Sequence, residues 1–64
     1  MERIVIVPGL CGNRPVVRGT RIRVQDVLEM LASGMTGSQI LEDFPDLHAA
    51  DIPACLAYAA RQLR

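Results

Sequence analysis

The stretch VQDVLEMLASGMTGSQILEDFP, residues 24–45, decides the fold. Its first apolar residues recur at the i, i+3, i+4, i+7 spacing of one buried helical face. These residues are Val24, Val27, Leu28 and Leu31. The pattern predicts a first helix over residues 24–33, and Gly34 stands where a left-handed residue commonly closes a helix.

A second, shorter helix is predicted over residues 37–43. Thr36 followed by Gln39 has the spacing of a capping box, in which each side chain satisfies a free backbone N–H group of the other residue. Ile40 and Leu41 supply its apolar face. The helix should end at Phe44, because the residue before a proline is pushed out of the helical region and Pro45 follows.

A third helix should follow a turn at residues 45–48. One apolar stripe marks it, made of Ile52, Cys55, Leu56, Ala59 and Leu63. Pro53 would cost about 3 kcal/mol inside a helix but is tolerated in the first turn. We therefore expect Asp51, and not His48, to be the N-cap residue.

The N-terminal part reads as an extended arm. Residues 3–7 predict a short strand of β-branched residues that Pro8 and Gly9 stop, and residues 10–14 predict a turn. Residues 15–17 can return as a second extended piece, before a bend at Gly19.

The predicted fold is mainly α, with a short N-terminal β arm and a trihelical, winged helix-turn-helix-like body. The 64 residues form a single domain, 1–64, with the arm over 1–23 and the three-helix body over 24–64. The same periodicity also fits any minimal three-helix core. A chain of this size buries only roughly 60% of its unfolded surface, so a homodimer is expected.

Charge is divided along the chain although the formal net charge is zero. Arg3 to Arg23 contains five arginines and no acid, whereas Asp26 to Asp51 contains six acids and no base. The candidate binding surface is the set Arg14, Arg18, Arg21 and Arg23. Guanidinium groups suit phosphates or an acidic pocket on a protein equally well. The alternative is that they form salt bridges to the acidic helices of this chain or of a dimer mate.

Other chemistry has little support. Cys11 and Cys55 lack metal-ligand spacing and are expected to be small buried hydrophobes, and His48 is the only histidine. We predict no catalytic residues, no metal and no cofactor. No signal peptide or membrane span is indicated, which leaves the cytoplasm as the default. The third helix would be a poor reader of DNA bases, since it offers no Arg, Lys, Asn or Gln before Arg61.

Four segments carry a resemblance to a known family. They are RPVVRGTRI (14–22), LASGMT (31–36), ILEDFPDL (40–47) and LAYA (56–59). The chain resembles the bacterial and archaeal family called domain of unknown function 433, DUF433. The resemblance assigns a signature arm of Arg14, Pro15, Arg18, Gly19, Thr20 and Arg21, and so adds Thr20 to the candidate residues. His48 departs from the usual threonine cap, and Pro53 and Cys55 depart from the usual third helix.

This resemblance implies a function as well as a fold. Many members look like VapB-like antitoxins, the antitoxin halves of type II toxin–antitoxin pairs, encoded beside a small PIN-like ribonuclease. The leading hypothesis is therefore an antitoxin that neutralises such a toxin and, as a dimer, binds operator DNA to repress its own operon. Arg18 or Arg21 would enter the acidic metal site of the nuclease. The alternatives are a stand-alone helix-turn-helix transcriptional regulator and a structural dimerisation module.

Overall fold

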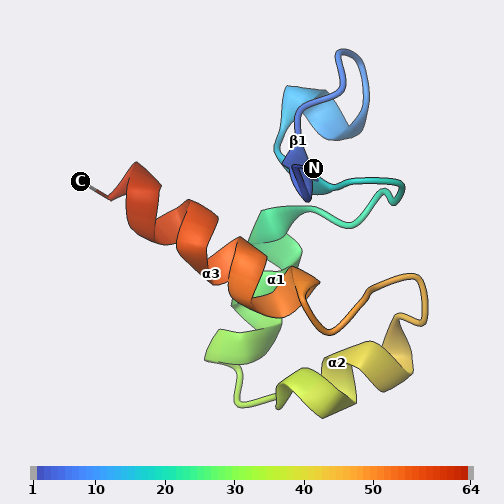
Figure 1. Cartoon of the computed structure of the whole chain (residues 1–64), viewed down its shortest axis with the longest axis vertical. Coiled ribbons are helices and arrows are strands. Elements are labelled where there is room, and N and C mark those ends of the chain that lie inside the picture. The colour runs from blue at the N-terminus through green and yellow to red at the C-terminus, as the bar shows by residue number, and fades with distance from the viewer. Residues whose placement is uncertain (1, 64) are drawn as a thin grey trace.

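The computed structural model describes residues 2–63; Met1 and Arg64, the two ends of the predicted domain, lie outside them. In chain order it contains β1 (Ile4–Val5), a 3-10 turn η1 (Cys11–Asn13), β2 (Val16–Val17), α1 (Val24–Ala32), α2 (Gly37–Asp43) and α3 (Asp51–Gln62). The expectation of a mainly helical chain with a short N-terminal β structure is confirmed. Figure 1 shows α3 crossing α1, with the N-terminal segment and α2 lying toward opposite ends of α1.

The two strands form an antiparallel pair with Ile4 opposite Val17 and Val5 opposite Val16. The predicted strand over residues 3–7 was too long. Arg18 N donates to Arg3 O at 2.7 Å. In this register a longer ladder would continue with hydrogen-bonded pairs between Val5 and Val16 and between Val7 and Arg14. The backbone oxygen of Val7 and the backbone N–H of Arg14, which would bond in the last pair, are instead used in local turns. Val7 O accepts from Leu10 N at 3.0 Å, and Arg14 N donates to Cys11 O at 3.3 Å.

The N-terminal segment is not an arm separate from the body, because it contributes to the core. One buried apolar cluster contains Ile4, Val17, Val24, Val27, Ile40, Leu47 and Cys55. Val16 is also buried and forms a bridge with Arg23, which joins β2 to the segment leading into α1. The core therefore draws on both strands, all three helices and the loop before α3.

Helices α1 and α2 begin and end close to their predicted limits. Gly34 adopts a φ of 100°, and the amide of Met35 donates to Met30 O at 3.1 Å, which closes α1 in the left-handed manner predicted. The capping box of α2 is present: Thr36 Oγ accepts from Gln39 N at 3.1 Å, and Thr36 N donates to Gln39 Oε1 at 2.8 Å.

The start of α3 differs from the prediction, because Asp51 is its first residue and Ala50 is the N-cap. The Asp51 amide donates to His48 O at 2.9 Å, which places Asp51 three residues into a turn that begins at His48. Its carboxylate Oδ2 reaches back to accept the His48 backbone N–H at 2.8 Å. Asp51 thus plays the part of the third residue of a capping box, and Pro53 lies in the first turn as predicted.

The predicted apolar stripe of α3 was too broad. Cys55 is buried, but Leu56 is 49% exposed and Leu63 is 87% exposed. Contacts between elements explain this, since α3 packs against α1 and β1, which leaves the remainder of its surface open. Among the residues that the structure describes, no helix has the length and apolar character needed to cross a membrane.

Replacing Thr36 with alanine should lower the free energy of unfolding by about 1 kcal/mol, because the Gln39 amide loses its capping acceptor. Chemical denaturation measures this change. Ser38→Ala is the matched control and should change stability less, because Ser38 is the second residue of α2 and its side chain does not cap the helix. Equal effects of the two substitutions would contradict the capping role.

Candidate partner-binding site

The five predicted binding residues do not form one continuous surface. Arg14 and Arg23 line a groove between α1 and α3. Arg18 lines a polar hollow near the start of α3, together with Glu2, Arg3, His48 and Asp51. Arg21 lies beside Ile22 and Phe44, away from both. The N-terminal segment therefore presents its arginines in several directions.

Thr20 stabilises the bend that carries two of these arginines. Its hydroxyl donates to Val17 O at 2.8 Å and accepts from Ile22 N at 3.0 Å. Gly19 before it has a φ of 79°, a conformation that glycine adopts without strain. The Thr20 hydroxyl is thus engaged within the turn, and its contribution is to position Arg18 and Arg21 on either side.

Arg23 is paired with an acid of its own helix. Its Nε and Nη2 donate to the Asp26 carboxylate at 3.1 and 2.8 Å, and its backbone N–H donates to the same group at 3.2 Å. The hydrogen bond from Arg23 lowers the pKa of Asp26, and the same bond raises the pKa of Arg23. Arg23 therefore forms a salt bridge within this chain, which was the alternative to a contact with a partner.

A second internal pair was not anticipated from the sequence. Arg3 Nη1 lies 3.1 Å from Asp51 Oδ1, and the Asp51 side chain is only 3% exposed. Arg18 Nε donates to the backbone oxygen of Glu2 at 2.6 Å, which leaves its terminal nitrogens open. Arg14 and Arg21 are exposed, and their guanidinium groups have no hydrogen-bond or ion-pair partner within residues 2–63.

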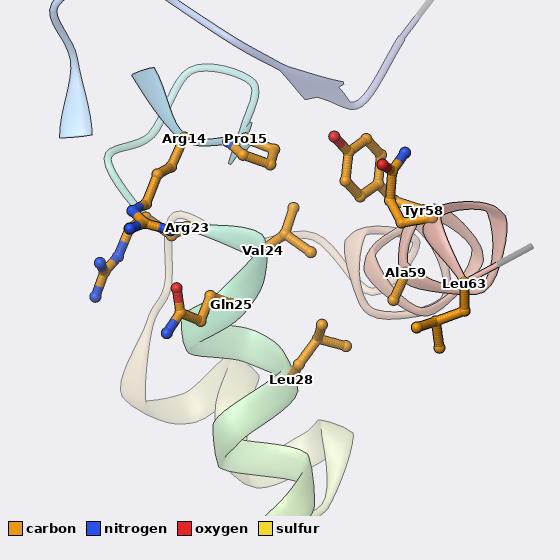
Figure 2. A pocket seen from close by; sticks show the side chains of 10 residues that line it. Arg14, Pro15, Arg23, Val24, Gln25, Leu28, Tyr58, Ala59 and Leu63 are labelled. Carbon is orange, nitrogen blue, oxygen red and sulfur yellow. The ribbon is translucent and has the colours of Figure 1, made fainter. Parts of the chain in front are cut away.

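The groove is a predominantly apolar hollow with a volume of about 370 Å³. Its walls are apolar residues of α1, of α3 with its C-cap residue, and of the position before β2: Val24, Leu28, Tyr58, Ala59, Leu63 and Pro15. Figure 2 shows Val24 and Leu28 of α1 facing Tyr58, Ala59 and Leu63 across the opening, with Arg14 and Arg23 together at the left, beside the start of α1 and away from α3. Gln25 and Gln62 complete the rim. The arrangement combines an apolar floor with a basic edge.

The sequence singled out some of the residues that line this groove but did not indicate the groove itself. Tyr58 was identified through the family signature, while Leu28 and Leu63 were expected in the core. Leu28 is half-buried and Leu63 exposed, so both retain apolar surface at the groove. The groove could not be predicted from the sequence, because it forms only where α3 packs against α1 and brings Tyr58 close to Val24 and Arg14.

The thiols offer little chemistry. Cys55 is fully buried as expected, and burial, with a smaller contribution from the nearby Asp51 charge, raises the pKa of its thiol to about 11. The same expectation was wrong for Cys11, which is only half-buried in the η1 turn and donates its Sγ–H to Arg21 O at 3.4 Å. Within residues 2–63, no three His, Cys, Asp or Glu side chains cluster in a way that could hold a metal ion.

Comparisons with known proteins give a consistent picture. A family model described as "Protein of unknown function (DUF433)" matches residues 4–59, from β1 into the last turns of α3. The uncharacterised protein y4eO of Sinorhizobium fredii is 40% identical over 58 residues, which make up 91% of this chain and 26% of that protein. The crystal structure of a DUF433 member protein from Anabaena variabilis matches with a TM-score of 0.90 and 31% identity, over 95% of this chain and 60% of that one. Both relatives extend well beyond the part that this chain matches.

Arg23→Gln should raise the pKa of Asp26 toward its ordinary value of 3.8, because the main cause that lowers it is removed. A lowered folded-state pKa stabilises the fold above the unfolded-state pKa, and this stabilisation is lost as pH falls through the folded-state value. The variant should therefore be less stable at pH 7, and the difference should vanish in strong acid. NMR titration of the Asp26 carboxyl measures the pKa; an unchanged midpoint, or an equal shift in Arg21→Gln, would contradict the pairing.

Proposed function

The chain belongs to the DUF433 family, proteins of unknown function, and on that premise we propose that it is a non-enzymatic, antitoxin-type module that binds and neutralises a partner nuclease. The groove between α1 and α3 is the observation that carries this proposal. It exposes apolar side chains beside arginines, which is the composition found at the centres of protein–protein interfaces. The family resemblance suggests the class of partner, a PIN-like ribonuclease.

The size of the chain is compatible with such binding. The folded surface measures 4380 Å², and an ordinary interface takes about 800 Å² from each partner, roughly a fifth of that surface. The groove with its Arg14 edge supplies a centre of suitable chemistry. Tyr58 and Leu63 provide the apolar contacts, and Arg14 provides a charge that suits an acidic residue on the partner.

Inhibition of the nuclease would come from an arginine of this chain that enters the acidic site of the partner. A guanidinium group forms two parallel hydrogen bonds to a carboxylate and can occupy a site that otherwise holds a divalent cation. Of the two candidates from the sequence, Arg21 fits this role better than Arg18. Its guanidinium group is exposed and without a partner within residues 2–63, whereas Arg18 is held by the Glu2 carbonyl.

DNA binding is the second part of the proposal, and its support is electrostatic. Residues 44–50 separate α2 from α3, which is longer than the turn of about three to four residues in a DNA-binding helix-turn-helix. The exposed residues at the start of α3 are His48, Ala49, Ala50 and Pro53. Only His48 among them has a polar side chain, and none can make the bidentate contact to a base that Arg or Asn makes. Operator binding would therefore rest on phosphate contacts from the arginines of the N-terminal segment, made by a dimer.

Binding to the product of the adjacent gene tests the proposal. The two proteins should co-purify, the neighbour alone should arrest growth, and calorimetry should show that Leu63→Glu and Arg14→Glu each weaken the complex at least about tenfold. Both residues are exposed, so the substitutions leave the core intact. Arg21→Ala should remove most of the neutralisation of nuclease activity.

The chain offers matched controls for both groove variants. Leu56→Glu is the control for Leu63→Glu, because Leu56 is an exposed leucine that does not line the groove. Arg61→Glu is the control for Arg14→Glu, because Arg61 is an exposed arginine outside the groove. Neither should weaken binding. Equal losses in the control variants would exclude the groove as the interface. No complex and no toxic neighbour would exclude the antitoxin function, and a stand-alone regulator acting through DNA would then be favoured.

A further inference from the structure

A second hollow, of about 390 Å³, lies where the N-terminal segment meets the start of α3. Glu2, Arg3, Arg18, His48 and Asp51 line it, and it shares no residue with the groove between α1 and α3. Three of its five residues carry nitrogen donors in the side chain. These donors come from segments far apart in the sequence, so only the fold brings them together.

The side chains of Arg3 and Arg18 are each held by a hydrogen bond that leaves other donors free, whereas His48 is held through its backbone. Arg3 gives Nη1 to Asp51 Oδ1 at 3.1 Å, and Arg18 gives Nε to the Glu2 carbonyl at 2.6 Å. The backbone N–H of His48 donates to Asp51 Oδ2 at 2.8 Å. The terminal nitrogens of Arg18, the remaining N–H groups of Arg3 and the imidazole of His48 have no partner among the described residues. The two anchored guanidinium groups bind an anion with less loss of side-chain freedom than mobile ones would.

The carboxylates of the hollow decide which ions it can take. Both Asp51 oxygens already accept hydrogen bonds from Arg3 and His48, and the Asp51 charge is balanced by Arg3. The hollow is therefore poorly suited to a cation, which would need those oxygens. Glu2 is exposed and opposes an anion through its charge, whereas Arg18 has no carboxylate partner among the described residues. What remains is the Arg18 guanidinium group, without a carboxylate partner among the described residues, in a hollow that Arg3 and His48 also line.

From this arrangement we propose that the hollow lined by Arg3, Arg18 and His48 binds a phosphate group. Donors from three separate residues line the hollow, and a phosphate group has more acceptor oxygens to receive them than a carboxylate has. The phosphate can be free or part of a nucleic-acid backbone, and its chemistry is the same in both cases. The site does not depend on the proposed nuclease partner, since no groove residue takes part in it.

Titration with inorganic phosphate at constant ionic strength, followed by amide NMR spectra of the whole chain, tests the site. We expect saturable shifts centred on residues 2–3, 18 and 48–51. Arg18→Gln should weaken binding about tenfold or more, because it removes charge-assisted hydrogen bonds. Glu2→Gln should tighten binding, since it removes a repelling charge and keeps the backbone carbonyl that holds Arg18.

Arg14→Gln is the matched control, because Arg14 is another exposed arginine of the N-terminal segment and lines the groove instead. It should leave phosphate affinity unchanged. Non-saturating shifts spread over all arginines, or equal losses in Arg18→Gln and Arg14→Gln, would overturn the proposal. A circular dichroism melt checks that Arg18→Gln remains folded. In a second arm, a short oligonucleotide that displaces phosphate from the hollow identifies a nucleic-acid backbone as the source; retention of phosphate identifies free phosphate.

Discussion

The Asp51 carboxylate is the group on which the rest of the structure depends. It is almost fully buried at the start of α3, and it accepts hydrogen bonds from two places, the guanidinium group of Arg3 and the backbone of His48. A buried carboxylate without partners carries a large desolvation cost, so these bonds specify how the N-terminal segment and α3 meet. The strand pair of Ile4–Val5 with Val16–Val17 is too short to fix that geometry by itself.

Both candidate sites follow from this connection. Once Arg3 is held at Asp51, β1 lies against α3, and β2 and the bend at Gly19 are positioned in turn. The hollow with Arg18 forms directly at the junction, and the groove forms where α3 passes the start of α1. The five arginines between Arg3 and Arg23 thereby divide into two groups. Arg3 and Arg23 satisfy acids of the chain itself, whereas Arg14, Arg18 and Arg21 keep donors directed outward.

Local signals in the sequence predicted the helices well and the sites only in part. The 3.6-residue periodicity, Gly34 and the Thr36–Gln39 capping box act within a few residues, so α1 and α2 could be bounded from the sequence. Asp51 was misassigned as an N-cap because the turn that leads into α3 already begins at His48, three residues earlier. Its second partner, Arg3, lies 48 residues away and could not be foreseen from local spacing. The strand was drawn too long because Val7 and Arg14 bond locally. The groove combines residues of α1 and α3, and no spacing along the chain reveals that juxtaposition.

A double-mutant cycle of Arg3→Gln and Asp51→Asn, measured by chemical denaturation, tests this account most directly. We expect the two substitutions to be coupled by about 1 kcal/mol, since the loss of either partner already removes the interaction. The double variant should then be more stable than the sum of the single effects predicts. Additivity within about 0.3 kcal/mol would contradict the account, because it would mean that Arg3 and Asp51 do not stabilise each other.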